Sequence, residues 1–122
     1  MATVLIVEDE SITVLDLKRL LKERGHEVVG TTKRGEDVID LVRRLTPDAI
    51  VMDIHLSGPM DGIVAAGEVR KEFQTPILFL TADALEEVNN RINALQPCAT
   101  IIKPFPAGDL ELALVQLLGV HP

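Results

Sequence analysis

The stretch Ala49-Ile50-Val51-Met52-Asp53-Ile54-His55 decides how the rest of the chain can be interpreted. Its apolar run has the length of a buried strand and delivers one carboxylate, that of Asp53, to the carboxyl end of that strand. A loop rich in turn residues, Ser57-Gly58-Pro59, follows after one further residue. Aspartate is common in turns and at helix caps. Asp53 taken alone therefore does not indicate a function.

A second apolar run, Val4-Leu5-Ile6-Val7, ends in a similar way at Glu8 and Asp9. If the two runs form neighbouring parallel strands, three carboxylates meet at one edge of a sheet. Two unit charges about 4 Å apart repel by roughly 4 kcal/mol at an effective dielectric constant near 20, so the cluster must protonate, separate or bind a cation. Oxygen ligands without sulfur or a ring of imidazoles favour Mg²⁺. Beside such an ion, a carboxylate can act as a nucleophile towards a phosphoryl group.

Composition restricts the class of protein. The 122 residues are 47% hydrophobic and 25% charged, which predicts a single globular domain over residues 1–122. The net charge of −7 and the scattered Lys and Arg residues argue against direct nucleic-acid binding. Cys98 is the one cysteine, so a disulfide within the chain is excluded and a reducing compartment is favoured. Without a signal pattern or an apolar run near the ~20 residues of a membrane span, we expect a soluble, cytoplasmic domain.

Five apolar runs alternate along the chain with five helical patterns. The expected strands are Thr3–Val7, Glu27–Thr31, Asp48–Met52, Ile77–Leu80 and Thr100–Ile102. The helical patterns are marked by Ile12, Leu15, Leu20 and Leu21; by Val38, Leu41, Val42 and Leu45; by Ala65, Ala66 and Gly67; by Leu85, Val88, Ile92 and Leu95; and by Leu110, Ala113, Leu114 and Leu117. Such alternation predicts an α/β fold, a doubly wound parallel sheet with helices on both faces. We expect the apolar stripe of the first helix, which includes Ile12 and Leu15, to pack on the sheet. The small residues Ala65, Ala66 and Gly67 suggest that the third helix packs closely against the strands.

Polar residues occur where four of the expected strands end. Glu8 and Asp9 follow the first strand, Asp53 the third, Thr81 the fourth and Lys103 the fifth. In open α/β sheets, sites form beyond the carboxyl ends of the strands. Singly, Thr81 would be read as a helix N-cap and Lys103 as a solvated surface lysine. Their joint occurrence at four strand ends favours a common site.

These motifs, taken in order, resemble the receiver domain of two-component response regulators. The resemblance rests on Glu8-Asp9, Asp53, Met60-Asp61-Gly62, Thr81-Ala82 and Lys103-Pro104-Phe105, and it covers essentially the whole chain. It implies a five-stranded, flavodoxin-like parallel sheet in the order 2-1-3-4-5. It also implies a signalling function in which Asp53 accepts a phosphoryl group from the phosphohistidine of a sensor histidine kinase or a phosphotransfer domain. Such a domain catalyses its own phosphorylation and slow dephosphorylation and is not a turnover enzyme.

The same resemblance implies a role for each site residue. Asp9, Asp53 and the backbone carbonyl of His55 would bind Mg²⁺, and Glu8 would reach the ion through water. The Lys103 ammonium, the Thr81 hydroxyl and the Ala82 backbone N–H would bind phosphoryl oxygens.

Further positions carry expectations of their own. By the same resemblance, His55 and Asp83 occupy the two variable places that influence how fast the phosphoryl group is lost, and the bond before Pro104 is expected to be cis. Thr81 and Thr100 would be the switch residues, but Ala99-Thr100 stands where the family usually has glycine and an aromatic residue. We therefore expect weaker output through the face formed by the fourth helix, fifth strand and fifth helix, in a monomer or weak dimer.

Three other classes of protein were compared with this pattern. A flavodoxin-like FMN carrier needs a phosphate-binding loop after the first strand, where Glu8-Asp9-Glu10 would repel the phosphate. A haloacid-dehalogenase-type phosphatase needs a second aspartate two positions after the nucleophile, and this chain has His55 there. The alternative that stays open is a receiver-like interaction module that is not phosphorylated.

Overall fold

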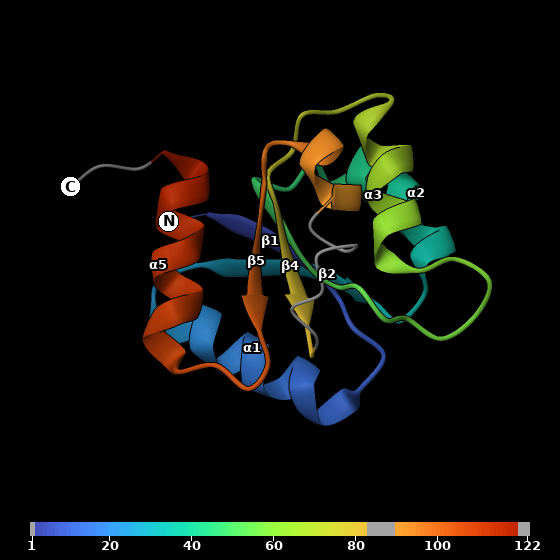
Figure 1. Ribbon diagram of the computed structural model, residues 1–122. Coiled ribbons are helices and arrows are strands. Elements are labelled where there is room, and N and C mark those ends of the chain that lie inside the picture. Colours follow the sequence, from blue (N-terminus) through green and yellow to red (C-terminus); the bar gives the residue numbers. More distant parts are fainter. Residues whose placement is uncertain (1, 83–89, 120–122) are drawn as a thin grey trace.

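The computed structural model describes residues 2–82 and 90–119 of the chain. Figure 1 shows a central sheet with helices on both sides. The strands are β1 (Thr3–Val7), β2 (Glu27–Thr32), β3 (Ala49–Asp53), β4 (Ile77–Thr81) and β5 (Cys98–Ile102). The α-helices with described bounds are α1 (Ser11–Glu23), α2 (Val38–Leu45), α3 (Gly62–Arg70) and α5 (Ala107–Leu118), and the 3₁₀ helices are η1 (Gly35–Asp37) and η2 (Asn93–Leu95).

All strand pairs in the sheet are parallel, and the order is β2-β1-β3-β4-β5. This confirms the fold class and strand order predicted from the sequence. The largest difference is at β5, which begins at Cys98 and not at Thr100 because Cys98 and Ala99 pair with Ile77 and Leu78. Alanine is a weak strand former, so pairing with the buried strand β4 overrides local preference here.

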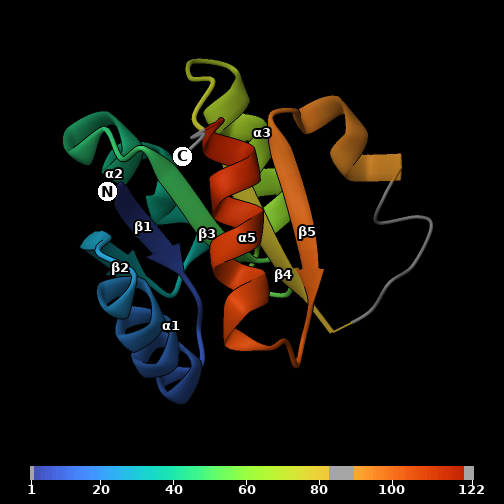
Figure 2. The ribbon, with the colours of Figure 1, turned by 90° about the vertical axis from the view of Figure 1, so that its left-hand side faces the viewer.

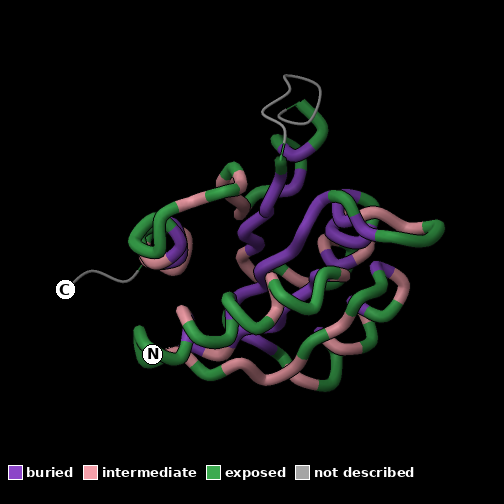
Figure 3. The backbone as a smooth tube through the Cα atoms, turned by 90° about the horizontal axis from the view of Figure 1, so that it is seen from below, coloured by how far each residue is buried: buried purple, intermediate pink, exposed green. Residues whose placement is uncertain are grey.

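Two hydrophobic cores lie on opposite faces of the sheet. One is formed with α2 and α3, and the other with α1 and α5, as Figures 1 and 2 show. Every residue of β3 and β4 is buried, which explains why these strands read as continuous apolar runs. In Figure 3 the buried residues are concentrated in the central strands β1, β3 and β4, while most exposed positions are on the helices and loops.

The apolar face of α1 differs from the expected one. Ile12 and Leu15 are 77% and 66% exposed, whereas Leu17 and Leu21 are buried against the sheet. Residues 17 and 21 are four apart and lie one above the other on a helix, while positions 12 and 15 belong to a different face. The prediction that Ile12 and Leu15 pack on the sheet was wrong.

The start of α3 depends on the absence of a side chain at Gly62. A Cβ at this position would lie 2.2 Å from the backbone oxygen of Asp53. Asp61 caps the helix by accepting from the Val64 backbone N–H at 2.8 Å. Ala65 and Ala66 are buried as expected, but nothing lies within 4 Å of a Cβ placed at Gly67. The close packing predicted for Gly67 was therefore wrong.

The remaining helix ends agree with the sequence. Helix α2 ends at Leu45, and Thr46, which precedes Pro47, has a left-handed backbone with φ of 41°. Helix α5 buries Leu110, Ala113 and Leu114 and is capped by Gly119 at φ of 66°. Of the fourth helical pattern, Leu85 and Val88 lie outside the described residues. Among those described, no helix has both the length and the apolar character needed to cross a bilayer.

Candidate functional site

The carboxyl ends of β1, β3, β4 and β5 lie along one edge of the sheet because the strands are parallel (Figure 2). At this edge Glu8 is fully buried, and Asp53 and Thr81 are 5% and 1% exposed. Backbone pairing fixes these positions, since Asp53 lies opposite Leu80 and Thr81 lies opposite Ile102. Buried polar groups of this kind need charged or hydrogen-bonding partners.

Three carboxylates meet at this edge, as the sequence predicts. One oxygen from each of Glu8, Asp9 and Asp53 lies within 4.8 Å of the others. The Nζ atom of Lys103 donates to Asp53 Oδ2 at 2.9 Å and to Glu8 Oε2 at 3.1 Å. One ammonium thus faces three carboxylates, which leaves an excess of negative charge when all three are ionised.

The protonation of this cluster follows from its burial. Burial raises the pKa of Glu8 to about 7; the nearby charge of Asp53 adds to this rise, and the hydrogen bond from Lys103 opposes it. Burial lowers the pKa of Lys103, but its hydrogen bonds to Asp53 and Glu8 outweigh that effect and raise it above the ordinary value. Lys103 is therefore a cation at neutral pH, and Glu8 is partly protonated there.

Asp53 has a fixed orientation. Its Oδ2 accepts from Lys103, and its Oδ1 accepts from the backbone N–H of His55 at 2.9 Å. The side chain of His55 is exposed. Two opposed donors therefore hold the carboxylate at the end of β3 in a single direction.

Asp9 is held by a residue that the sequence analysis did not select. Both the hydroxyl and the backbone N–H of Ser57 donate to Asp9 Oδ2, at 2.6 and 3.1 Å. The Ser57 hydroxyl is the main cause that lowers the pKa of Asp9, so this carboxylate is ionised at neutral pH. Ser57 belongs to a turn-rich loop, and no signal in the sequence connects it with a residue 48 positions away.

The other predicted residues lie around this cluster or outside the described ranges. Ala82 is exposed next to buried Thr81, and the Thr81 carbonyl accepts from the Lys103 backbone N–H at 2.7 Å. The Lys103–Pro104 peptide bond is cis. Asp83 lies outside the described residues.

Thr100 lies opposite Phe79 in the sheet. Its hydroxyl oxygen is buried and, within the described part of the chain, has no hydrogen-bond partner. An unpaired buried hydroxyl is destabilising. The sequence pattern marks the position of Thr100 but does not show that its hydroxyl is buried and unpaired.

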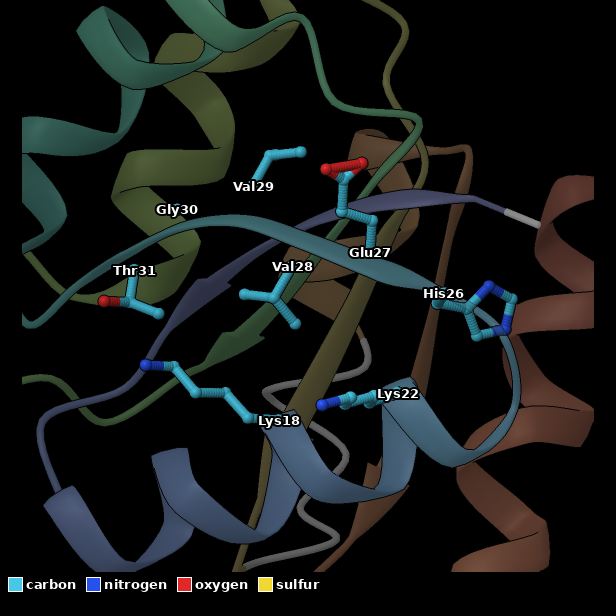
Figure 4. A pocket seen from close by; sticks show the side chains of 8 residues that line it. All are labelled: Lys18, Lys22, His26, Glu27, Val28, Val29, Gly30 and Thr31. Atoms are coloured by element: carbon cyan, nitrogen blue, oxygen red, sulfur yellow. The ribbon is translucent and has the colours of Figure 1, made fainter.

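Glu8 and Lys103 each line a groove, of about 240 and 500 Å³ respectively. A groove of about 550 Å³ lies elsewhere, between α1 and the edge strand β2, and none of the carboxylates described above lines it. Figure 4 shows Lys18 and Lys22 extending from α1 beside this strand. The chemistry of the sheet edge and this groove are therefore separate features.

Comparison with known proteins identifies the family. The family model described as the response regulator receiver domain matches residues 4–115. The chain belongs to the response regulator receiver domain family. Among curated relatives, the transcriptional regulatory protein PdtaR of Mycobacterium tuberculosis is 36% identical over 111 residues, which are 91% of this chain and 54% of PdtaR. The chain thus spans about half the length of this relative.

Solved structures agree with this assignment. The chemotaxis protein CheY4 of Vibrio cholerae has a TM-score of 0.87 at 28% identity, with 96% of this receiver domain and 98% of that chain covered. The receiver domain of sensor histidine kinase PA1611 from Pseudomonas aeruginosa, solved with a magnesium ion in its active-site cleft, has a TM-score of 0.85 at 27% identity and 98% coverage of both chains. These findings confirm the resemblance: the chain is a phosphoacceptor signalling domain of two-component signal transduction.

Receiver domains are generally signalling modules without turnover chemistry, and some relatives join one to an enzyme. The protein-glutamate methylesterase/protein-glutamine glutaminase 3 of Hahella chejuensis is 33% identical over 120 residues. The match covers 94% of this receiver domain but 34% of that protein. The match therefore carries no esterase activity over to this chain.

Proposed function

We propose that Asp53 is the phosphoacceptor of this receiver domain. The observation that carries the proposal is the geometry of its carboxylate, held at the end of β3 by Lys103 on Oδ2 and by the His55 N–H on Oδ1. Glu8 and Asp9 stand beside it but make different contacts, since Glu8 is fully buried and Asp9 is tied to Ser57. Glu8 also accepts from Lys103, at 3.1 Å, but it has no exposed surface through which an incoming phosphoryl group could reach it, whereas Asp53 is 5% exposed.

The residues present fit a magnesium ion. The cluster offers only hard oxygen donors and carries more negative charge than Lys103 balances, which is the chemistry Mg²⁺ prefers. Asp9, Asp53 and the backbone carbonyl of His55 would hold the ion, and Glu8 would contact it through water. A bound Mg²⁺ supplies charge neutralisation for the carboxylate and the incoming phosphoryl group.

The chain's own residues then position the reaction. An oxygen of Asp53 attacks phosphorus while the bond to the donor nitrogen breaks. Lys103, which pairs with Asp53 beforehand, pairs with a phosphoryl oxygen afterwards. The Thr81 hydroxyl and the Ala82 backbone N–H donate to the remaining oxygens. Positioning and charge stabilisation account for most of the catalysis of phosphoryl transfer, so no general base is required.

The donor and the output follow from this chemistry. The donor is the phosphohistidine of a sensor histidine kinase or phosphotransfer domain. The reaction takes place in the cytoplasm. We assign residues 1–122 to a single receiver domain that acts as a monomer or weak dimer. It passes the signal to an effector through a face that includes β5 and α5.

Intact-mass measurement tests the proposal. Incubation with acetyl phosphate and Mg²⁺ should add one phosphoryl group to the parent protein and none to Asp53→Asn. Chelation of Mg²⁺ should abolish the addition to the parent. Undiminished phosphorylation of Asp53→Asn would remove Asp53 from the role. A parent protein that takes up no phosphoryl group would favour the unphosphorylated interaction module.

A further inference from the structure

The loop between β3 and α3 is tied to the segment after β1 by a pair of hydrogen bonds. The hydroxyl and the backbone N–H of Ser57 both reach Asp9 Oδ2, at 2.6 and 3.1 Å. A hydroxyl bonded to a carboxylate at such a distance forms a short, charge-assisted bond, roughly twice as strong as a neutral one. The pair joins two site loops that are far apart in the sequence.

Lys103, the cation of the cluster, does not hold the Asp9 carboxylate in place. Lys103 directs its hydrogen bonds to Asp53 and Glu8, whereas among the described residues it is Ser57 that donates hydrogen bonds to the Asp9 side chain. Asp9 is also less buried than Glu8 and Asp53, so it has fewer packing constraints. Its orientation depends on the serine.

The two ends of the loop are fixed independently of Ser57. The Gly62 N–H donates to the Ile54 carbonyl at 2.9 Å, which joins the two ends of the loop, and Met60, near the second end, packs closely on Gly35 of η1. The tip, Ser57-Gly58-Pro59, is exposed. The contact with Asp9 therefore attaches the part of the loop that is least constrained otherwise.

We propose that Ser57 is a positioning residue for the metal site. Its hydroxyl holds the Asp9 carboxylate and the nearby His55 backbone, two residues away in sequence, in the arrangement that accepts Mg²⁺. This inference rests on the proposed function, since it concerns the same site. It goes further in assigning a determinant of metal affinity to a loop residue outside the acidic cluster.

The bonds from Ser57 leave room for the ion. A carboxylate has about four lone-pair sites on its two oxygens, and both bonds from Ser57 go to Oδ2. Holding a ligand in its bound arrangement beforehand removes part of the ordering cost of binding. Loss of the hydroxyl should therefore weaken Mg²⁺ binding by about three- to tenfold.

Calorimetric titration of the metal-free protein with Mg²⁺ tests this. The variants are Ser57→Ala, which removes the hydroxyl, Ser57→Thr, which keeps it, and Asp9→Ala, which removes the carboxylate. Ser11→Ala is the matched control, because Ser11 is an exposed serine at the start of α1 whose hydroxyl accepts from Lys33. Circular dichroism of each metal-free variant establishes that it is folded.

The expected order of Mg²⁺ affinity is parent, Ser11→Ala and Ser57→Thr together, then Ser57→Ala, then Asp9→Ala. Equal or tighter binding by Ser57→Ala would overturn the inference and leave the metal site intact. A parent that binds no Mg²⁺ would overturn the metal site itself, and the inference with it. Amide hydrogen exchange without metal gives a second readout: the residue 57 amide should exchange faster in Ser57→Ala, and unchanged protection would also overturn the inference.

Discussion

Gly62 allows α3 to begin directly against the backbone of β3. A Cβ at this position would approach the Asp53 backbone oxygen to 2.2 Å. Either α3 or β3 must therefore move in Gly62→Ala. We expect a loss of about 1–3 kcal/mol in the free energy of unfolding, the usual range for overpacking. Urea denaturation measures the change.

Gly67→Ala is the matched control within the same helix. A Cβ there meets nothing within 4 Å, and alanine is favoured over glycine in a helix by roughly 0.5–1 kcal/mol. Gly67→Ala should therefore stabilise the protein. Similar destabilisation by both substitutions would contradict the packing described for Gly62.

Cys98 gives a pH-dependent prediction away from the acidic cluster. Burial raises the pKa of its thiol, and the nearby charge of Arg70 opposes this only in part. The thiolate fraction in the folded protein is therefore lower than that of a free cysteine at every pH below the raised pKa. The rate of alkylation by iodoacetamide should keep rising with pH through the range in which a cysteine in a short peptide levels off.

The same alkylation in urea provides the comparison. Unfolding exposes the thiol and restores its ordinary pKa, so the plateau should appear at lower pH. A plateau at the peptide's pH in the folded protein would contradict the predicted effect of burial.

At the scale of a single element, we expect β5 to carry the change from the proposed phosphoacceptor towards α5, and Thr100 to limit that change. Threonine has few rotamers to exchange and a small side chain, and here it replaces the aromatic residue usual in the family. Binding of beryllofluoride, a mimic of the phosphoryl group, should shift backbone amide signals strongly around Asp53 and Thr81. The signals of β5 and α5 should move little.

Thr100→Tyr is the corresponding gain-of-coupling variant. An aromatic side chain buries more area and gives the two states a larger difference in packing. Beryllofluoride should then shift α5 signals more than in the parent. Broad α5 shifts in the parent, comparable to those at the site, would contradict weak coupling.

Sequence patterns predicted the elements best where burial is complete. Strands β3 and β4 are buried throughout, so continuous apolar runs identified them, and turn residues bounded them. The face of α1 was harder to assign because apolar side chains occur on two of its faces, and only the packed structure shows that Leu17 and Leu21 face the sheet. A one-dimensional pattern cannot tell a buried face from an exposed apolar one.

The acidic cluster could be predicted because strand ends of a parallel sheet share one edge. Glu8, Asp9, Asp53 and Lys103 are brought together as expected. The role of Ser57 could not be predicted, since it depends on how a loop folds back over a distant residue. Loop conformation is set by tertiary contacts such as Gly35 with Met60, which leave no periodic signal.

For the whole molecule, the acidic cluster links folding to metal binding. Repulsion among three carboxylates opposes folding, and a cation that binds only the folded state stabilises it by mass action. The thermal midpoint of the parent should therefore rise with Mg²⁺, by an amount that grows with the logarithm of its concentration. The midpoint of Asp9→Ala should not change. Scanning calorimetry measures both midpoints. Equal shifts in both proteins would remove Asp9 from the site.

Chemical trapping of the phosphorylated residue tests the central claim most directly. Borohydride reduces an aspartyl phosphate to homoserine, so peptide mass spectrometry after reduction identifies the residue that carried the phosphoryl group. We predict homoserine at position 53, only in protein incubated with both a phosphoryl donor and Mg²⁺. Homoserine at position 9, or phosphoryl uptake with Asp53 unmodified, would contradict the assignment of Asp53 as the phosphoacceptor.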